Sequence, residues 1–273
     1  MTTIKTVFTN STISREDVTA FSLKDYARAH GVFTTFIAEY QEGNGAYKVA
    51  ALNYHLERLV SNAKALGIYN PNISEHRINF IEQQLFECLG QPRLPSSLPN
   101  RLPTKRVRII VLKDQLEIVT DDYTRPWAAD QAIKVMTFVG QRENPQIKST
   151  NMQVCFAARE YAQQNGAQEA FLVSTDGQLL EGTSSNIFWF DAEGRLYTIQ
   201  CNSIRANVLP GITRRVILEN QNCIECEITL EEFLVTAKEA FITQSTTGIT
   251  PVSHINDTIV LGGNLASRIN FKL

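Results

Sequence analysis

The chain has 273 residues, with 26 Lys and Arg against 28 Asp and Glu, and 43% of its residues are hydrophobic. This length suits one large domain or two ordinary ones, and the composition is that of a soluble globular protein. The formal net charge of −2 gives no basic excess for a nucleic-acid partner, and the apolar runs are too short to span a membrane. The first ten residues lack the apolar core of a signal peptide, so we expect a cytoplasmic protein.

The cysteines are few and scattered, which bears on metals and on the cellular compartment. Cys223 and Cys226 have C-x-x-C spacing, but neither a second pair nor a nearby His completes a zinc site. We therefore expect free thiols in a reducing cytoplasm and no bound metal. The five cysteines are Cys88, Cys155, Cys201, Cys223 and Cys226.

The N-terminal part of the chain predicts a small sheet. A short strand comes first, and Asp25–Ala29 predicts a helical turn. Gly31–Tyr40 is rich in β-forming residues and predicts a strand, and Tyr47–Ala51 predicts the strand that returns. Between them, Gln41–Ala46 contains two glycines and predicts a hairpin turn.

Two amphipathic helices follow this hairpin. From Tyr54, apolar residues share one face of a helix that Gly67 ends, and Asn72–Leu89 predicts a second helix with Ser74 as its cap. The proline-rich segment Gln91–Pro103 predicts a surface loop. The apolar face of the first helix consists of Leu56, Leu59, Val60, Ala63 and Leu66.

The pattern then predicts a division into two domains. Strands at Arg106–Leu112 and Leu116–Thr120 complete the first domain, which we place at residues 1–120. Residues 121–130 are interpreted as a linker, because they are irregular and contain a proline. Residues 131–273 form the second domain, which opens with a strand at Ile133–Val139.

The second domain is organised around the stretch that starts at Lys148. A helix is predicted over Asn151–Asn165, followed by a short buried strand at Ala170–Val173. The polar segment EGTSSN begins at Glu181 and continues directly into an apolar strand at Ile187–Phe190. This order of elements is able to bring Lys148 and Glu181 to two sides of one cleft.

A candidate anion site lies further along the chain. Leu209–Arg214, which reads LPGITR, opens a helix that extends to Asn220. The first N–H groups of such a helix, its dipole and the hydroxyl of Thr213 would together favour an anion. The remaining predicted elements are strands at Leu196–Gln200 and Ala240–Thr243, a helix at Leu230–Lys238 and a polar loop at Gln244–Val252.

Four motifs resemble those of the class IV aminotransferase family, the pyridoxal-phosphate enzymes of fold type IV. EGTSSNIF from Glu181 is similar to the family's E-G-[ST]-x-x-N-[IVL]-F, and Arg142 to Lys148 is similar to R-x-x-P-x-x-K. His55–Leu59 is similar to H-[IL]-x-R-L, and Leu209–Arg214 to L-x-G-[IV]-[TM]-R. The resemblance implies an α/β (α+β) fold of two domains, similar to D-amino-acid aminotransferase, with the cofactor at their boundary. It also implies a homodimer.

The resemblance implies a role for each of the two central residues. Lys148 would hold pyridoxal 5'-phosphate as a Schiff base and carry a proton between carbon centres. Glu181 would meet the pyridine nitrogen and keep it protonated, which makes the ring a stronger electron sink. On residue type alone, a lysine is more often a solvated surface residue and EGTSSN an ordinary polar turn. The presence of both in order favours the family reading.

The resemblance also implies which residues bind the cofactor's phosphate. An arginine fork matches a phosphate better than a lysine does, and helix N–H groups favour it further. For His55 a structural role is favoured, and an ordinary polar turn remains the alternative for the threonines that follow Ser245. The candidate phosphate ligands are Arg58, Gly211, Ile212, Thr213, Thr246 and Thr247.

Three functions remain open from the sequence. The first is an aminotransferase that moves an amino group between an amino acid and a 2-oxo acid. The second is an aminodeoxychorismate lyase, because Thr34 stands in GVFTT where the family's G-x-F-E-T has a glutamate, and some lyases of the family share that threonine. The third is an inactive protein that keeps the fold as a binding module. Small molecules are the expected partners in each case.

Overall fold

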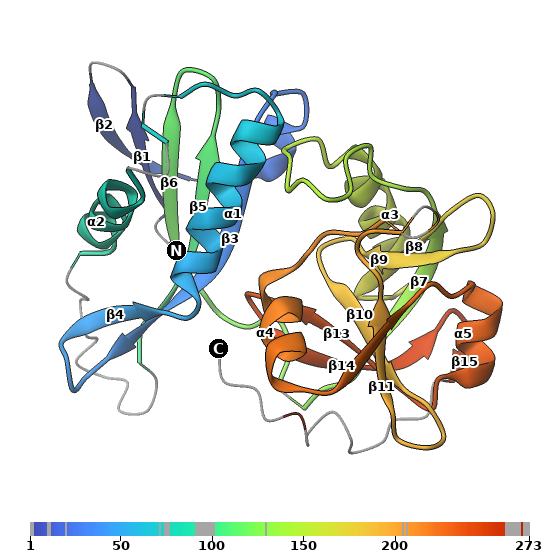
Figure 1. Ribbon diagram of the computed structural model, residues 1–273. Coiled ribbons are helices and arrows are strands. Elements are labelled where there is room, and N and C mark those ends of the chain that lie inside the picture. The colour runs from blue at the N-terminus through green and yellow to red at the C-terminus, as the bar shows by residue number, and fades with distance from the viewer. Residues whose placement is uncertain are drawn as a thin grey trace. The chain divides into compact units, whose positions relative to one another are not determined.

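The computed structural model describes residues 3–9, 12–19, 21–70, 72–73, 77–90, 102–128, 130–203, 205, 207–259 and 269. Contacts between residues divide the chain into two compact units, each with its own sheet (Figure 1). The first unit comprises Met1–Arg125 and Ile147–Asn151, and the second comprises Pro126–Gln146 and Met152–Leu273.

The first unit is built on an antiparallel sheet with the strand order β2-β1-β6-β5-β3-β4. The predicted hairpin is confirmed by β3 and β4, and the predicted pair that follows the proline-rich segment by β5 and β6. The described strands are β1 (Thr3–Phe8), β2 (Ile13–Val18), β3 (Val32–Gln41), β4 (Ala46–Val49), β5 (Thr104–Val111) and β6 (Leu116–Asp122). A short 3-10 helix, η1 (Leu23–Tyr26), precedes β3.

One face of this sheet forms a hydrophobic core with two helices, α1 (Leu52–Ala65) and α2 (Ile78–Leu89). Side chains alternate along a strand, so Val32, Phe36 and Ala38 of β3 lie on the same face. They share one buried cluster with the apolar stripe that the sequence predicted for α1. The two helices therefore fix the sheet by burying a continuous apolar layer.

The second helix begins later than predicted. It starts at Ile78 rather than near Asn72, and the predicted cap Ser74 lies outside the described residues. The cause is a local turn, in which the side chain of Asn70 accepts a hydrogen bond from the backbone N–H of Asn72 at 2.8 Å. Such side-chain bonds compete with helix formation, so Asn72 is held in a turn and does not begin the helix.

The second unit contains a mixed sheet with the order β12-β11-β10-β13-β14-β7-β8-β9 and β15 beside β14. The pairs β7–β8, β7–β14 and β11–β12 are parallel, and the others are antiparallel. The described strands are β7 (Ile133–Val139), β8 (Glu169–Val173), β9 (Leu179–Gly182), β10 (Asn186–Phe190), β11 (Leu196–Ile199), β12 (Cys223–Cys226), β13 (Glu239–Gln244), β14 (Gly248–Ile255) and β15 (Thr258–Ile259).

Alternation along β10 directs its aromatic side chains into two different layers. Phe188 stacks on Phe241 of β13 with ring centroids 5.3 Å apart, whereas Trp189 packs edge-on against Phe233 at 5.3 Å. The three predicted helices are confirmed as α3 (Gln153–Gln164), α4 (Ile212–Asn220) and α5 (Leu230–Thr236). The predicted polar loop is shorter than expected: residues 245–247 form a turn, and β14 already begins at Gly248.

The division of the chain differs from the sequence-based one at the lysine. The sequence pattern places Lys148 in the domain of residues 131–273, whereas the contacts group Ile147–Asn151 with the first unit. The physical reason is backbone pairing with the start of β3. The N–H of Phe33 donates to the carbonyl of Lys148 at 3.0 Å, and Ser149 forms a β-bridge with Val32.

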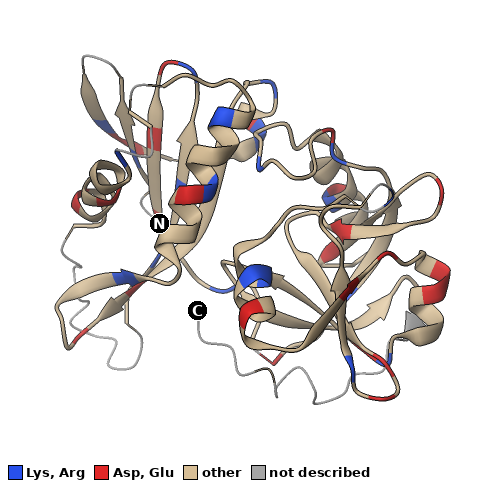
Figure 2. Cartoon of the chain, in the orientation of Figure 1, with Lys and Arg blue, Asp and Glu red and all other residues tan. Residues whose placement is uncertain are grey.

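Charged residues of both signs are interspersed along the two units (Figure 2). In the part of the chain that the structure describes, no helix is both long and apolar enough to cross a membrane. All five cysteines are free thiols, as predicted, and three of them are buried.

The first-unit core predicts a large cost for truncating a buried side chain of α1. Leu59 is 1% exposed, so Leu59→Ala should lower the free energy of unfolding by about 2–5 kcal/mol through lost burial and a residual cavity. Lys64→Ala, on the exposed side of the same helix, should change it by no more than about 0.5 kcal/mol. Urea unfolding of both variants measures the difference. Equal costs would contradict the packing described here.

Candidate active site

Lys148 is held by backbone bonds on both sides of its own residue. Its N–H donates to the side-chain oxygen of Asn62 on α1 at 2.8 Å, and its carbonyl accepts from Phe33 at 3.0 Å. The Lys148 ammonium lies 4.7 Å from the centre of the Phe33 ring, a cation–π distance. The hydroxyl of Thr150 donates to the carbonyl of Ala29 at 2.5 Å, which fixes the residues that follow. The lysine side chain is therefore presented from a rigid segment.

Arg58, His55 and Thr34 form a polar cluster in the same unit. The Thr34 hydroxyl lies 2.7 Å from Nδ1 of His55 and 3.4 Å from a guanidinium nitrogen of Arg58. His55 and Arg58 lie three residues apart on α1, so they share one side of its first turns. His55 has the structural role that the sequence favoured for it, because its ring is 1% exposed and hydrogen-bonded.

The electrostatics of this cluster are set by His55. Burial lowers the pKa of His55 well below its usual 6.5, and the positive charges of Arg58 and Lys148 lower it further. The imidazole is therefore neutral at physiological pH. Arg58 and Lys148, the candidate residues of this unit, therefore both lie close enough to His55 to affect its pKa.

Glu181 is the centre of a second cluster, in the second unit. It is 5% exposed at the end of β9, and both of its carboxylate oxygens are held. Nε of Arg142 donates to Oε1 at 2.8 Å, and the backbone N–H of Leu209 donates to Oε2 at 3.0 Å. Arg142 is also buried, and a second nitrogen of its guanidinium donates to the carbonyl of Pro145. A charge-assisted contact in such a buried place fixes the carboxylate in one position.

Hydrogen bonds connect the Glu181 carboxylate to the segment that leads into the N-terminus of α4. Asn186 donates from its side chain to the carbonyl of Leu209 at 2.9 Å, which orients the segment that leads into α4. Gly211 is the N-cap of the helix, and a Cβ there would overlap the side-chain oxygen of Asn186. A larger residue at position 211 would therefore displace the Asn186 side chain from its bond to the Leu209 carbonyl.

The helix terminus has the features of an anion site. No side chain caps it among the described residues, so the first N–H groups of the helix have no side-chain acceptor. The hydroxyl of Thr213 is buried and has no hydrogen-bond partner within the described residues. A buried hydroxyl without a partner is costly, which is expected where a ligand supplies the missing bond.

The predicted threonine pair lies in the turn between β13 and β14. Thr247 is 5% exposed, and its hydroxyl accepts from that of Thr250 at 3.4 Å, whereas Thr246 is half-buried. Nε1 of Trp127 donates to the Thr250 hydroxyl at 3.3 Å. The structure thus shows an ordered polar turn, and the role of both threonines as phosphate ligands stays a prediction.

Several contacts around these residues were not anticipated from the sequence. In the sequence Arg142 stands out only as part of a motif, and its ion pair with Glu181 is a long-range contact that spacing does not reveal. Asn62 follows Arg58 by one helical turn, and a buried polar residue on an otherwise apolar face was the available signal. Within the described ranges, no group of three or more His, Cys, Asp and Glu has the geometry of a metal site.

A family model described as amino-transferase class IV matches residues 31–255. This match covers most of the chain, and it includes every residue of the two clusters above. The chain belongs to the class IV aminotransferase family, whose members are enzymes that use pyridoxal phosphate.

Individual relatives agree with the family and differ in their named activities. A D-alanine aminotransferase of Bacillus licheniformis is 29% identical over 244 residues, which covers 82% of this chain and 83% of that protein. An aminodeoxychorismate lyase of Bacillus subtilis is 36% identical over 107 residues, which covers only 37% of this chain and 34% of that protein. The similarity to the lyase is therefore confined to part of the chain.

Solved structures confirm the predicted fold type. A fold IV transaminase from Curtobacterium pusillum superposes with a TM-score of 0.75 at 19% identity and covers 99% of this chain and 98% of that one. A branched-chain amino acid aminotransferase of Escherichia coli has a TM-score of 0.73 at 20% identity, with coverage of 97% and 91%. At these identities the likeness establishes the fold of the chain.

The buried pair predicts that Arg142 is important for stability. In Arg142→Ala the carboxylate of Glu181 keeps its burial but loses its charged partner, which should lower the free energy of unfolding by about 3–5 kcal/mol. A suitable control is Arg215→Ala, which removes a pair with Glu219 whose side chains are 49% and 43% exposed. Its cost should stay below about 1 kcal/mol. Denaturant unfolding of both variants without ligand gives the comparison, and a small cost for Arg142→Ala would refute the importance of the pair.

The low pKa of His55 predicts a pH dependence of stability. The unfolded chain protonates this histidine near pH 6.5 and the folded chain does not, so the unfolded state binds more protons below that pH. The free energy of unfolding should therefore fall as the pH drops below 6.5, with a slope from this group of up to about 1.4 kcal/mol per pH unit. His55→Asn should remove this component of the slope. If wild type and variant show the same pH profile, His55 is not the group responsible.

Proposed function

We propose that this chain is a pyridoxal-phosphate-dependent aminotransferase that moves an amino group between an amino acid and a 2-oxo acid. The observation that carries the proposal is the buried Glu181 carboxylate, fixed by Arg142 and Leu209 beside a helix terminus whose Thr213 hydroxyl has no partner among the described residues. A fixed carboxylate suits a protonated pyridine nitrogen, and the helix terminus suits a phosphate. Family membership adds the expectation that both belong to one cofactor.

The residues present fit the cofactor's phosphate. Thr213 offers a buried hydroxyl that needs a partner, and the adjacent N–H groups of Gly211 and Ile212 begin a helix without a side-chain cap. A phosphate dianion would satisfy these donors and the positive end of the helix dipole together. Arg58 is proposed as a further ligand, because its planar guanidinium suits phosphate oxygens. Thr246 and Thr247 complete the proposed set.

Pyridoxal phosphate, when bound, supplies an aldehyde carbon that amines attack and a ring that accepts electrons from the substrate carbon. Lys148 is proposed to hold the cofactor through Nζ and to carry the proton removed from the substrate. Its fixed backbone limits the positions that Nζ reaches, which lowers the entropy cost of aligning the amine for proton transfer. Glu181 is proposed to accept a hydrogen bond from the ring nitrogen and to keep the proton there.

A lyase acting on aminodeoxychorismate is the second candidate. Thr34 supports it, because some lyases of the family share this threonine, and here its hydroxyl joins His55 to Arg58. The partial coverage of the lyase-named relative makes this candidate the weaker one. An inactive binding module is weaker still, because a binder requires neither a rigidly presented lysine nor a buried carboxylate held at both oxygens.

We also propose that the enzyme is a cytoplasmic homodimer. The dimer rests on the resemblance to the family, and the compartment on five thiols that remain free of disulfides. Light scattering during gel filtration measures the mass of the assembly directly. A mass of one chain would remove the dimer from the proposal without affecting the chemistry.

The test of the reaction is a spectral half-reaction. The purified protein with its cofactor is mixed separately with L-amino acids, D-amino acids and aminodeoxychorismate. We expect one series of amino acids to convert the bound cofactor to its amine form. Lys148→Ala should slow this conversion by about 10²–10⁴-fold, because the group that moves the proton is lost.

The control is Lys48→Ala, an exposed lysine of β4, which should leave the rate unchanged. If amino acids leave the spectrum unchanged while aminodeoxychorismate releases pyruvate, the chain is a lyase. If no substrate reacts although the cofactor is bound, the chain is an inactive member of the family.

A further inference from the structure

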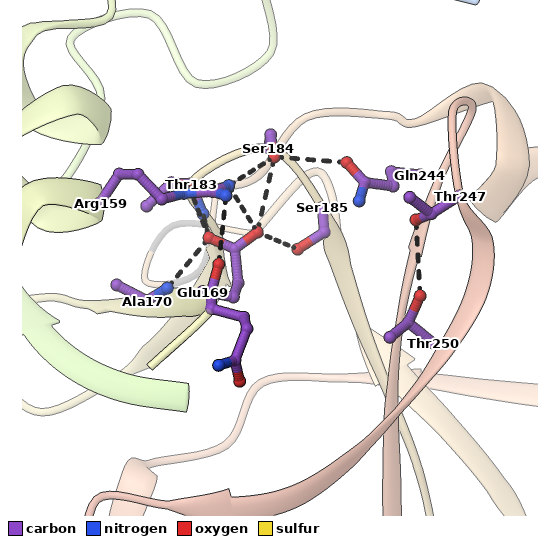
Figure 3. Close-up of polar contacts among 10 residues, drawn as sticks. Arg159, Glu169, Ala170, Thr183, Ser184, Ser185, Gln244, Thr247 and Thr250 are labelled. Atoms are coloured by element: carbon purple, nitrogen blue, oxygen red, sulfur yellow. Dashed lines mark hydrogen bonds and ion pairs between the residues drawn. The ribbon is translucent and has the colours of Figure 1, made fainter. Parts of the chain in front are cut away.

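Glu169 is a buried carboxylate to which the proposed reaction assigns no role. It stands at the start of β8 and is 1% exposed. Its carboxylate accepts hydrogen bonds from every side (Figure 3). A charge so deeply buried is costly unless its partners are fixed, so the arrangement around it is specific.

Most of the donors come from one short segment, the turn of Thr183, Ser184 and Ser185 between β9 and β10. Oε1 of Glu169 accepts from the hydroxyl of Thr183 at 2.5 Å and from its backbone N–H at 3.2 Å. Oε2 accepts from the hydroxyl of Ser185 at 3.2 Å and, at 3.5 Å, from that of Ser184. Three consecutive hydroxyls thus point to one carboxylate (Figure 3).

Arg159 of α3 completes the cluster and supplies the opposite charge. Its guanidinium donates to Oε2 of Glu169 at 3.0 Å, to the Thr183 hydroxyl at 2.6 Å and to the Ser184 hydroxyl at 2.8 Å. The Thr183 and Ser184 hydroxyls therefore accept from Arg159 and can still donate their own protons to Glu169. The directions of these bonds require an acceptor at position 169, which a carboxylate provides at both oxygens.

The turn is flanked by Glu181, a proposed cofactor residue, and by Asn186, which orients the segment that leads into α4. Glu181 lies directly before Gly182, and Asn186 directly after Ser185. The Asn186 side chain donates to the carbonyl of Leu209, and the N–H of Leu209 donates to Glu181. Leu209 thus connects the residues on the two sides of the turn. A Cβ at Gly182 would overlap the Ser185 hydroxyl, which shows how tightly the turn is folded against Glu169.

A second branch leads from the same turn to β13. The single proton of the Ser184 hydroxyl has an alternative acceptor, the side-chain oxygen of Gln244, 3.4 Å away. Gln244 is the last residue of β13, and the turn of residues 245–247 follows it (Figure 3). Thr246 and Thr247, the proposed cofactor contacts in the turn 245–247, are thus connected to the turn 183–185 that Glu169 holds.

We propose that Glu169 is a positioning residue that fixes the turn 183–185, so that Glu181 and Asn186 keep their places in the site. This inference rests on the proposed function for the identity of the cofactor. Glu169 does not touch the reacting atoms in this assignment and acts through the segment that carries Glu181. Its loss should therefore disturb the environment of the pyridine nitrogen and should affect more than folding alone.

Glu169→Gln is the sharpest test, because it preserves size and replaces one acceptor by a donor. Whichever oxygen becomes an amide, N–H donors lose their acceptor: Arg159 on one side, the Thr183 and Ala170 N–H groups on the other. The hydroxyls beside the new N–H₂ must also turn from donating to accepting. The turn must then rearrange. Glu117→Gln is the matched control, since Glu117 is also 1% exposed and accepts from Tyr26 and Gln115, but it lies in the first unit, outside both proposed clusters.

The measurements are the dissociation constant of pyridoxal phosphate, the pH titration of the bound cofactor's absorption band, and kcat and KM for the best amino acid. We expect Glu169→Gln to bind the cofactor more weakly than wild type does. The absorption band of its bound cofactor should titrate at a different pH. Its kcat should fall by about 10²-fold with little change in KM, as for a group misplaced by a small distance. Glu117→Gln should keep the wild-type titration and kcat, even if it unfolds more easily.

If Glu169→Gln does not fold, Thr183→Val and Ser185→Ala test the same contacts with smaller changes. Each removes a hydroxyl that donates to Glu169. Each should shift the titration of the cofactor's absorption band in the direction that Glu169→Gln shifts it. Wild-type titration, cofactor affinity and kcat in the folded variants would overturn the inference and leave the proposed function intact. A wild-type protein that takes up no pyridoxal phosphate would instead overturn the proposed function, and the inference with it.

Discussion

The candidate site of the second unit depends on one buried ion pair, between Arg142 and Glu181. A carboxylate with 5% exposure needs a charged partner, and the guanidinium supplies it within 2.8 Å. Once that carboxylate is fixed, the N–H of Leu209 has a defined acceptor, and the chain that leads to α4 has a defined path. The helix terminus and the carboxylate are therefore positioned by the same few contacts.

In the first unit, two positively charged residues act on one buried histidine. Arg58 and Lys148 both act on His55, and burial keeps the imidazole neutral, so it adds no third positive charge. The Thr34 hydroxyl bonds to the ring and contacts the guanidinium. An anion near these residues would be attracted without competing with an internal carboxylate. The family's usual glutamate at position 34 would provide such a carboxylate, so the threonine makes this cluster more positive.

Local patterns predicted most elements of the fold, because burial on one face leaves a periodic trace. Leu56 and Leu59 mark α1 in this way, and the motif around Glu181 identified the central carboxylate and the family. Contacts that join distant segments left no such trace. The Asn70 turn delays α2, the Ser149–Val32 bridge moves Lys148 to the first unit, and Glu169 has partners from α3 and from the turn after β9. Spacing along the chain does not encode such tertiary partners.

The pairing of the lysine segment with β3 has a consequence for dissecting the protein. The chain enters the second unit after Arg125, returns for the five residues Ile147–Asn151 and then leaves again. A fragment that stops at Arg125 would leave the N–H of Phe33 without its acceptor and Asn62 without the N–H it binds. A fragment that starts at Pro126 would carry the lysine without the strand that orients it. Neither unit is therefore a separable piece of the gene, and exchanging one unit between relatives requires moving two segments of sequence together.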